Sequence, residues 1–268
     1  MDNQEIMFEV DNGVALISLN RPDQLNSVNG AMLQGLGDAY RRCDEDDEVR
    51  VVVVTGAGKA FCAGADLSQA GATFDQQEDM SFSSCPLSMQ AYEVRKPVIA
   101  ACNGHAIGVG LGIAVQCDTR ILAEEGKYGF LQSRRGVIAD FTIHHLLPRM
   151  IGLENALELI LSGRRLTGTE AKEKGLAGRV LPADEVLPAA LELACDIATN
   201  CSPLVVGMAK NMIWQGMEQS IDDMEQLETR LLHYSMGRPD AIEGGMAFFE
   251  KRTPEWKSSV SNDWPDWF

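Results

Sequence analysis

Residues 103–118 read Asn-Gly-His-Ala-Ile-Gly-Val-Gly-Leu-Gly-Ile-Ala-Val-Gln-Cys-Asp and follow an apolar run, Val98 to Cys102. Glycine has no Cβ, so the four glycines of this stretch let the backbone approach another backbone or a ligand closely. A helix that begins behind such a turn presents unpaired N–H groups and the positive end of its dipole. The stretch therefore predicts a strand, a glycine turn and a helix whose first turn can hold negative charge developing on an oxygen.

The same pattern of strand, turn and helix recurs on either side of this stretch. The run Val51 to Val54 is typical of a strand buried on both faces. Asn12-Gly13 separates two alternating stretches, 6–10 and 14–19, which predicts a two-residue hairpin. Strands that alternate with helices indicate a largely parallel sheet with helical cover, so the predicted fold class is α/β.

Further elements follow from periodicity and capping. Thr167 with Glu170 three residues later forms a capping box and marks a helix start. Residues 68–84, rich in Ser, Gln, Asp and Ala, are expected to form a mobile loop or a frayed helix near a pocket. We expect helices at 30–44, in the residues leading to Arg95, at 141–150, 153–162, 184–200 and throughout the chain from 204 onward, and strands at 98–102, 119–123, 128–131 and 175–181.

Composition excludes several classes of protein. With 268 residues, 45 % of them hydrophobic, the chain can form one large domain or a core with an appendage. The net charge of −16 and the lack of a basic stripe argue against a nucleic-acid partner. The N-terminal residues show no signal-peptide pattern. The most apolar long run, 97–115, carries Asn103, His105 and four glycines and is a poor membrane span, so no membrane partner is expected.

The seven cysteines are scattered without metal-ligand spacing, and most stand among apolar neighbours. They suit small buried hydrophobic residues in a reducing compartment, so we expect a cytoplasmic protein. The four histidines have no paired acids or cysteines, which argues against a structural zinc site. No metal is expected.

Five ordered motifs resemble the crotonase superfamily, also called the enoyl-CoA hydratase/isomerase family, over nearly the whole chain. The motifs are Asn20-Arg21-Pro22 with Leu25-Asn26, the run Phe61 to Leu67, the run Lys96 to Gly104, Gly108 to Gly110 with Cys117-Asp118, and Gly244 with residues 248–252. Each motif alone is weak, but the ordered set is specific. The resemblance implies a crotonase-like spiral of ββα units at residues 1–200 and a C-terminal helical trimerisation region at residues 201–268.

The resemblance also implies a ligand and an assembly. Family members bind acyl-CoA, need no separate cofactor because coenzyme A is part of the substrate, and are commonly homotrimers or dimers of trimers. The oxyanion hole would be the backbone N–H groups of Ala65 and Val109, although the family usually has glycine at the second position. Asp23 departs from the family, whose members often carry a lysine there for a CoA phosphate. The residues expected to bind CoA and substrate are Gln24, Leu25, Ala63, Gly64, Asp66, Leu67 and Gln132, with Phe248 and Lys251 supplied by a neighbouring subunit.

The acids of the site decide the predicted reaction. Hydratases of this family use two glutamates, and the matching positions here are Gly112 and Gln132, neither of which titrates. Asp140 is the one acid nearby, at a position where several double-bond isomerases of the family carry Asp or Glu. A single carboxylate can take a proton from C2 and return it to C4 on the same face. The residues therefore favour isomerisation with Asp140 as the catalytic acid and base.

Other interpretations stay open at the level of the sequence. Asp140 could instead cap the helix expected from Phe141. The chain could hydrate an enoyl-CoA with one acid or with an unrecognised second one, or it could bind acyl-CoA without catalysis. Attack by Asp140 on an aryl-CoA carbon, as in the aroyl-CoA dehalogenases, is disfavoured because Gln132 replaces their tryptophan.

Several other polar residues are weaker candidates. His105 could line the acyl pocket or pack in its turn, and Arg134 and Arg135 could reach an acid at an interface or a CoA phosphate. Packing or surface roles are expected for Cys62, Cys102, Glu124, Glu125, His144, His145, Trp214 and Tyr234.

Overall fold

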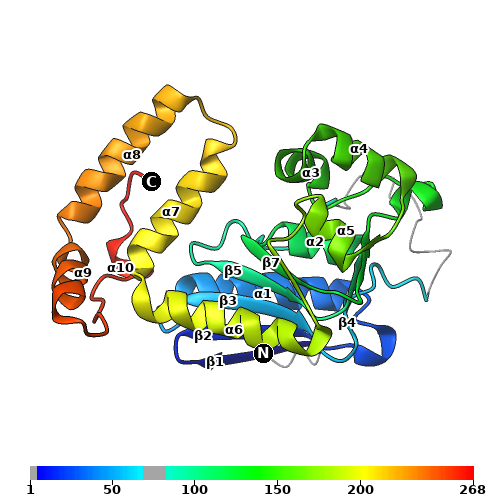
Figure 1. The fold of residues 1–268 in the computed structure, drawn as a ribbon, viewed down its shortest axis with the longest axis horizontal. Coiled ribbons are helices and arrows are strands. Elements are labelled where there is room, and N and C mark those ends of the chain that lie inside the picture. Colours follow the sequence, from blue (N-terminus) through cyan, green and yellow to red (C-terminus); the bar gives the residue numbers. More distant parts are fainter. Residues whose placement is uncertain (1–4, 69–82) are drawn as a thin grey trace.

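The computed structural model describes residues 5–68 and 83–268 and contains two sheets with helices around them (Figure 1). The larger sheet has six strands in the order β1-β2-β3-β5-β7-β10, and the smaller has four in the order β4-β6-β8-β9. The strands are β1 (Ile6–Asp11), β2 (Val14–Leu19), β3 (Val51–Gly56), β4 (Ala60–Cys62), β5 (Val98–Cys102), β6 (His105–Ile107), β7 (Thr119–Ala123), β8 (Lys127–Gly129), β9 (Leu166–Thr167) and β10 (Arg179–Leu181).

The sheets are largely parallel, as the sequence predicts. Among the described strands, the pairs β1–β2 and β8–β9 are antiparallel and the other pairs are parallel. Asn12 and Gly13 have φ of 49° and 81° in the hairpin between β1 and β2, the conformation that such a two-residue turn requires. The α/β class and the hairpin are confirmed.

Strand β3 separates two hydrophobic cores, and all six of its residues are buried. Val51 and Val53 pack against α6 (Ala183–Asn200), whose small residues Ala190 and Ala194 let the helix lie close to the sheet. The alternate valines face the second core, which holds α1 (Gly30–Glu45) and α2 (Val109–Val115). Each buried aliphatic side chain contributes about 1.5–3 kcal/mol. This burial fixes the strand register and thus the place where the turn before α2 emerges.

Three further helices lie near α2 in Figure 1: α3 (Ile143–Ile151), α4 (Leu153–Ser162) and α5 (Gly168–Glu173). The predicted capping box begins α5. Thr167 Oγ1 accepts the Glu170 N–H at 3.2 Å, and Glu170 Oε2 accepts the Thr167 N–H at 2.7 Å. This prediction is confirmed.

The described C-terminal helices are α7 (Pro203–Gly216), α8 (Ile221–Met236), α9 (Pro239–Glu250) and α10 (Val260–Asp263), and they project to one side of the sheets (Figure 1). Buried Lys210 attaches α7 to the core. Its Nζ donates to Ala91 O (2.8 Å) and Lys96 O (3.0 Å) and pairs with Asp118 Oδ2 (2.9 Å). Helix α6 ends at Asn200, while the division of the chain into two units at residues 200 and 201 stays a prediction.

No single helix of the described residues is long and apolar enough to cross a membrane. Helices α6 and α7 have the required length and hydropathy only when they are counted together, and their axes are bent by 117° relative to each other.

Some elements differ from the prediction. Residues 91–96 form turns and not a helix, because their backbone groups bond to distant partners: the Arg95 N–H donates to Asp44 Oδ1 at 2.7 Å, and two carbonyls accept Lys210 Nζ. Helix α3 begins at Ile143 because Phe141 and Thr142 have φ of 58° and 55°. The strands expected at 128–131 and 175–181 are short, at 127–129 and 179–181. The expected loop 68–84 lies largely outside the described residues.

Candidate active site

The backbone N–H of Ala65 is available to a ligand. Ala65 and Val28 form an isolated parallel bridge, in which Val28 N–H donates to Gly64 O (2.8 Å) and Asp66 N–H donates to Val28 O (2.9 Å). This bridge uses both polar backbone groups of Val28 and neither of Ala65. The Ala65 N–H has no hydrogen bond to the described part of the chain.

The second available amide is that of Val109, the first residue of α2. A residue at this position has no carbonyl one turn earlier to which its N–H could donate. The preceding Gly108 has φ 54° and ψ −119°, a conformation that favours glycine, and its own N–H donates to Gly129 O at 2.9 Å. The Val109 N–H is unpaired within residues 5–68 and 83–268.

Glycines hold the two amide-bearing turns against each other. Strands β4 and β6 pair with Cys62 opposite Ala106. A Cβ at Gly110 would lie 2.3 Å from Cys62 O, and one at Gly64 would lie 3.1 Å from Ile107 O. Such contacts leave no room for a side chain at Gly110. Segments 62–65 and 107–110 are therefore in direct contact, as two amides that share one oxygen require.

Asp140 lies beside the same turn and is linked to it through Gln132. Gln132 Nε2 donates to Asp140 Oδ1 at 3.3 Å. The same amide lies over Gly108, where a Cβ would stand 3.3 Å from Nε2. Burial raises the pKa of Asp140 above its ordinary value and outweighs the lowering effects of hydrogen bonds and of His144. A carboxylate with a raised pKa is a stronger base.

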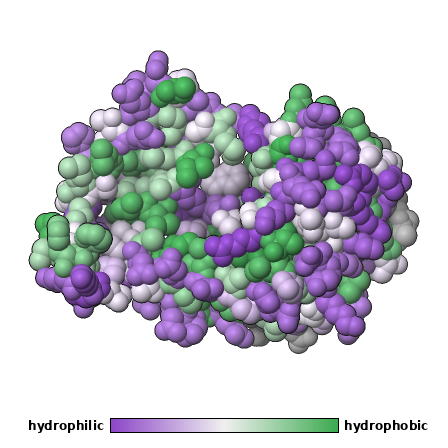
Figure 2. Space-filling model, in the orientation of Figure 1, coloured by the Kyte–Doolittle hydropathy of each residue, from purple (hydrophilic) through white to green (hydrophobic). Residues whose placement is uncertain are grey.

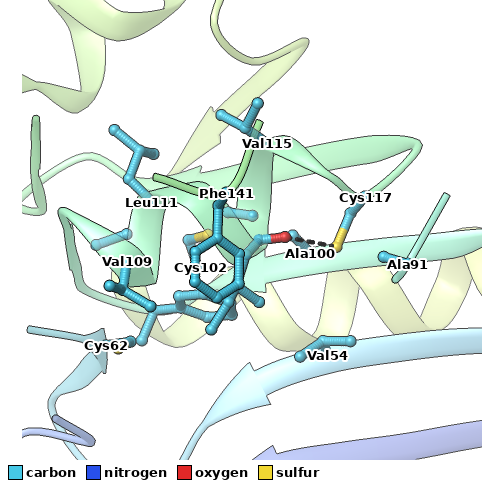
Figure 3. Close-up of a cluster of buried hydrophobic side chains, with 14 of the residues drawn as sticks. Val54, Cys62, Ala91, Ala100, Cys102, Val109, Leu111, Val115, Cys117 and Phe141 are labelled. Atoms are coloured by element: carbon cyan, nitrogen blue, oxygen red, sulfur yellow. Dashed lines mark hydrogen bonds between the residues drawn. The ribbon is translucent and has the colours of Figure 1, made fainter. Parts of the chain in front are cut away.

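Phe141 fills the space that a side chain at position 112 would need. An ideal Cβ at Gly112 would lie 2.7 Å from Phe141 Cβ and 3.1 Å from its Cγ. Phe141 is buried in the cluster that also contains Cys102, Val109 and Leu111 (Figure 3). Position 112, which the resemblance matches to one of the hydratase glutamates, thus has no room for a side chain unless Phe141 moves.

The helix-cap interpretation of Asp140 is wrong. The N-cap residue of α3 is Thr142, and no side chain caps this helix. Phe141 and Thr142 are both left-handed, which costs non-glycine residues about 1–2 kcal/mol each. Strain of this kind persists where the surrounding structure enforces it, often at functional sites. Here the strained turn packs Phe141 against Gly112 of α2 and places Asp140 within hydrogen-bond distance of Gln132.

The predicted CoA-binding residues fall on two segments that contact each other. Ala63 N–H donates to Leu25 O at 3.0 Å, and Arg21 pairs with Asp66 Oδ2 at 2.8 Å. The backbone N–H of Ser68 and the Arg21 guanidinium lower the pKa of Asp66 to about 2. A polar cavity of about 600 Å³ lies next to them, lined by residues 5–7 and 20–24. The structure brings together Gln24, Leu25, Ala63, Gly64, Asp66 and Leu67, whose binding role stays a prediction.

Asn26 organises this loop, a role that its place in a sequence motif does not reveal. It is buried with φ 55°. Its Nδ2 donates to Ala57 O (2.9 Å) and Ala60 O (2.8 Å), and its Oδ1 accepts the Arg21 N–H (2.8 Å). Asn26 thus ties the loop to the start of β4, which leads to Ala65.

Phe248 and Lys251 do not lie at the site of their own chain. Helix α9, which contains Phe248 and ends before Lys251, is on the opposite side of the molecule from α2 (Figure 1). Phe248 is 78 % exposed. A role of these two residues at the site of a neighbouring copy stays a prediction.

Several of the weaker candidates have hydrogen-bond or ion-pair partners within the structure. His105 Nδ1 accepts the Lys127 N–H at 3.1 Å, and His145 Nε2 pairs with Glu218 at 2.8 Å. Trp214 Nε1 donates to Asp118 (2.7 Å) and Arg134 to Ser162 O (2.7 Å). Burial raises the pKa of Cys62 to about 12, so this thiol is no nucleophile. No group of three His, Cys, Asp or Glu residues within the described ranges could hold a metal ion.

Comparison with known proteins gives one consistent result. The family model described as enoyl-CoA hydratase/isomerase matches residues 9–259. A Mycobacterium bovis protein named as a probable enoyl-CoA hydratase is 36 % identical over 95 % of this chain and 98 % of its own. A probable enoyl-CoA hydratase/isomerase from Mycobacterium abscessus, 44 % identical, superposes with a TM-score of 0.92 over 95 % of this chain and 99 % of its own. An enoyl-CoA hydratase from Bacillus anthracis is 36 % identical, and it superposes with a TM-score of 0.88 over 95 % of this chain and 99 % of its own.

Proposed function

The chain belongs to the enoyl-CoA hydratase/isomerase family and has its crotonase fold, and we propose that it moves the C3–C4 double bond of an acyl-CoA to C2–C3. One observation carries the proposal. The half-buried carboxyl of Asp140 accepts a hydrogen bond from the Gln132 side-chain amide. That amide lies over Gly108, whose neighbour Val109 has an unpaired N–H in the described residues. The two positions that carry the hydratase acids hold Gly112 and Gln132 instead.

The reaction needs one base and one oxyanion site. The N–H groups of Ala65 and Val109 bind the thioester oxygen, and Asp140 takes a proton from C2. As the C2–H bond breaks and the carboxyl O–H bond forms, the electron pair is delocalised onto the thioester oxygen and over C2 to C4. The same proton then returns to C4, which leaves the double bond at C2–C3 and Asp140 ionised. Removing an oxyanion donor typically costs about 2.7–4 kcal/mol of transition-state stabilisation.

The decisive test is conversion of a 3-enoyl-CoA to the 2-enoyl-CoA by the wild type and by Asp140→Asn. Asparagine keeps the shape of the side chain but cannot carry the proton. We expect a loss of about 10²–10⁴-fold in kcat, the usual contribution of a positioned acid–base group. Undiminished activity in the variant would remove Asp140 from the mechanism.

Hydration of a 2-enoyl-CoA is the second candidate, and the names of the relatives support it. The absorbance of crotonyl-CoA falls when water adds across its double bond. Loss of that absorbance with wild type would establish hydration, while no loss at high enzyme concentration would reject it. Binding of acyl-CoA in calorimetry without turnover of any substrate would indicate a non-catalytic binding protein.

The same proposal extends to assembly and location. Apolar side chains gather over the C-terminal helices and continue into the hollow beside the core (Figure 2). Ile221, Ile242, Phe248 and Phe249 are each more than two-thirds exposed. A homotrimer or a dimer of trimers would cover such residues and bring Phe248 and Lys251 to a neighbour's CoA. All seven cysteines are free, which suits the cytoplasm.

A further inference from the structure

The two polar atoms of the Gln132 side chain have unequal surroundings. Nε2 donates to Asp140 Oδ1, whereas Oε1 is buried and has no hydrogen-bond partner in the described part of the chain. An unpaired buried acceptor costs about 1–3 kcal/mol. An ionised carboxylate accepts hydrogen bonds but donates none. The NH₂ end of the amide thus faces Asp140 in the orientation that an ionised carboxylate accepts.

We propose that Gln132 is the positioning residue of this site, which keeps Asp140 ionised and directs it toward the turn at Gly108-Val109. This inference rests on the proposed isomerase function, because it assigns Gln132 to the base of that reaction. The Nε2–H occupies Oδ1 and leaves Oδ2 to form the bond with the C2 proton. Gln132 itself neither gains nor loses a proton.

The backbone around Gln132 fixes the place of the amide. Gln132 is the first residue of the short 3₁₀ helix η3 (Gln132–Arg135), which ends at left-handed Gly136. Its carbonyl accepts the Val137 N–H at 3.2 Å. On the other side the amide lies over Gly108, where the lack of a Cβ makes room for it. The orienting group is thus held at both its backbone and its amide end.

Few other titratable groups act on Asp140. Within the described residues they are His144, exposed near the start of α3, and Cys85. Burial raises the pKa of the Cys85 thiol, so the thiol is neutral at pH 7. Gln132 is the side chain whose hydrogen bond reaches the Asp140 carboxyl. Its effect can be removed without changing the charge of the site.

Two substitutions separate the hydrogen bond from shape and charge. Gln132→Met keeps the length of the side chain and removes both polar atoms, and Gln132→Glu keeps its shape and adds an anion. Ser133→Ala, at the next and exposed residue, is the matched control. Two readouts apply to all variants: the titration of the Asp140 carboxyl by ¹³C NMR, assigned with Asp140→Asn, and the pH profile of kcat/KM. Thermal unfolding verifies that each variant is folded.

We expect the Asp140 titration to move to higher pH in Gln132→Met and further in Gln132→Glu, with the acid limb of kcat/KM moving alongside. In Gln132→Met, kcat at neutral pH should fall about 10-fold, equivalent to 1.36 kcal/mol, while KM stays nearly constant. Ser133→Ala should behave as wild type. A titration and an acid limb that stay in place in folded Gln132→Met would overturn the proposal.

The carboxyl titration does not require turnover, so the two proposals can fail separately. If the wild type does not isomerise 3-enoyl-CoA but the Asp140 titration still depends on Gln132, the isomerase function fails and the control of Asp140 by Gln132 stands. If isomerisation occurs and the titration of the Asp140 carboxyl does not change in the Gln132 variants, only the positioning role fails.

Discussion

A side chain at Gly112 would collide with Phe141, because an ideal Cβ there lies 2.7 Å from Phe141 Cβ. Phe141 cannot easily retreat, since it is 1 % exposed and its N–H donates to Ser84 O at 3.0 Å. The absence of a side chain at position 112 is thus coupled to the turn that contains Asp140 and Phe141.

Restoring that acid should therefore damage the protein without creating a hydratase. Gly112→Glu is expected to lower the free energy of unfolding by about 1–3 kcal/mol through overpacking, and to leave crotonyl-CoA hydration no faster than in wild type. Urea unfolding and the crotonyl-CoA assay measure both. Gly178→Glu is the control, because nothing lies within 4 Å of a Cβ at Gly178. Equal stability of the two variants would contradict the steric argument.

Removing the Asp140 charge should stabilise the protein while it slows isomerisation. The pKa of Asp140 is raised on folding, mainly by burial, so the folded state binds its proton more tightly than the unfolded chain does. This effect lowers the free energy of unfolding above the folded pKa and disappears below the unfolded value of about 3.9. Asp140→Asn should be more stable than wild type at pH 7, and the difference should vanish as the pH falls toward 3.9.

Urea unfolding across this pH range measures the difference. Asp23→Asn, which removes a carboxyl that is exposed to solvent, is the matched control. A gain in Asp140→Asn that persists undiminished at the acid end would show that lost charge is not its cause.

The turn at Gly108 should tolerate no side chain. Gly108→Ala forces a Cβ into a left-handed backbone, which costs about 1–2 kcal/mol, and places it 3.3 Å from Gln132 Nε2. We expect a loss of kcat larger than that in Gly152→Ala, where φ is 78° and nothing lies within 4 Å. Steady-state kinetics of both variants makes the comparison, and equal losses would mean that backbone strain alone is responsible.

Lys210 should be essential for attachment of the C-terminal helices. Lys210→Met leaves Asp118 without its cation and two buried carbonyls without their donor. Breaking a buried pair in this way costs about 3–5 kcal/mol. Denaturant unfolding should show this loss, whereas Lys257→Met, at a side chain 64 % exposed, should stay close to wild type. A small effect at Lys210 would mean that α7 docks by apolar contacts alone.

Thiol titration should distinguish the buried cysteines from the exposed one. Cys195 is exposed and should react at once in the native protein. Cys43, Cys62 and Cys117 are buried, and burial raises the pKa of each to about 12. These thiols should react only after denaturation. Rapid reaction of any of them in the folded protein would contradict the described packing.

The sequence alone determined the features that depend on residues near one another in the chain. The hairpin at Asn12-Gly13, the buried strand at Val51–Val54 and the capping box at Thr167 follow from turn chemistry, periodicity and hydrogen bonds over a few residues. The order of these elements and the family motifs then sufficed for the α/β class and the crotonase fold. The positions of Asp140 and Gln132 in the sequence were enough to single them out, but not to relate them.

The tertiary structure decided what depends on distant residues. The turns at 91–96 replace a helix because Lys210 and Asp44 satisfy backbone groups there. Phe141 occupies the space beside Gly112, and Gln132 donates a hydrogen bond to Asp140. Both contacts join segments that are separate in the sequence. Packing density and hydrogen bonding between segments set such contacts, and no local pattern in the chain encodes which segments will touch.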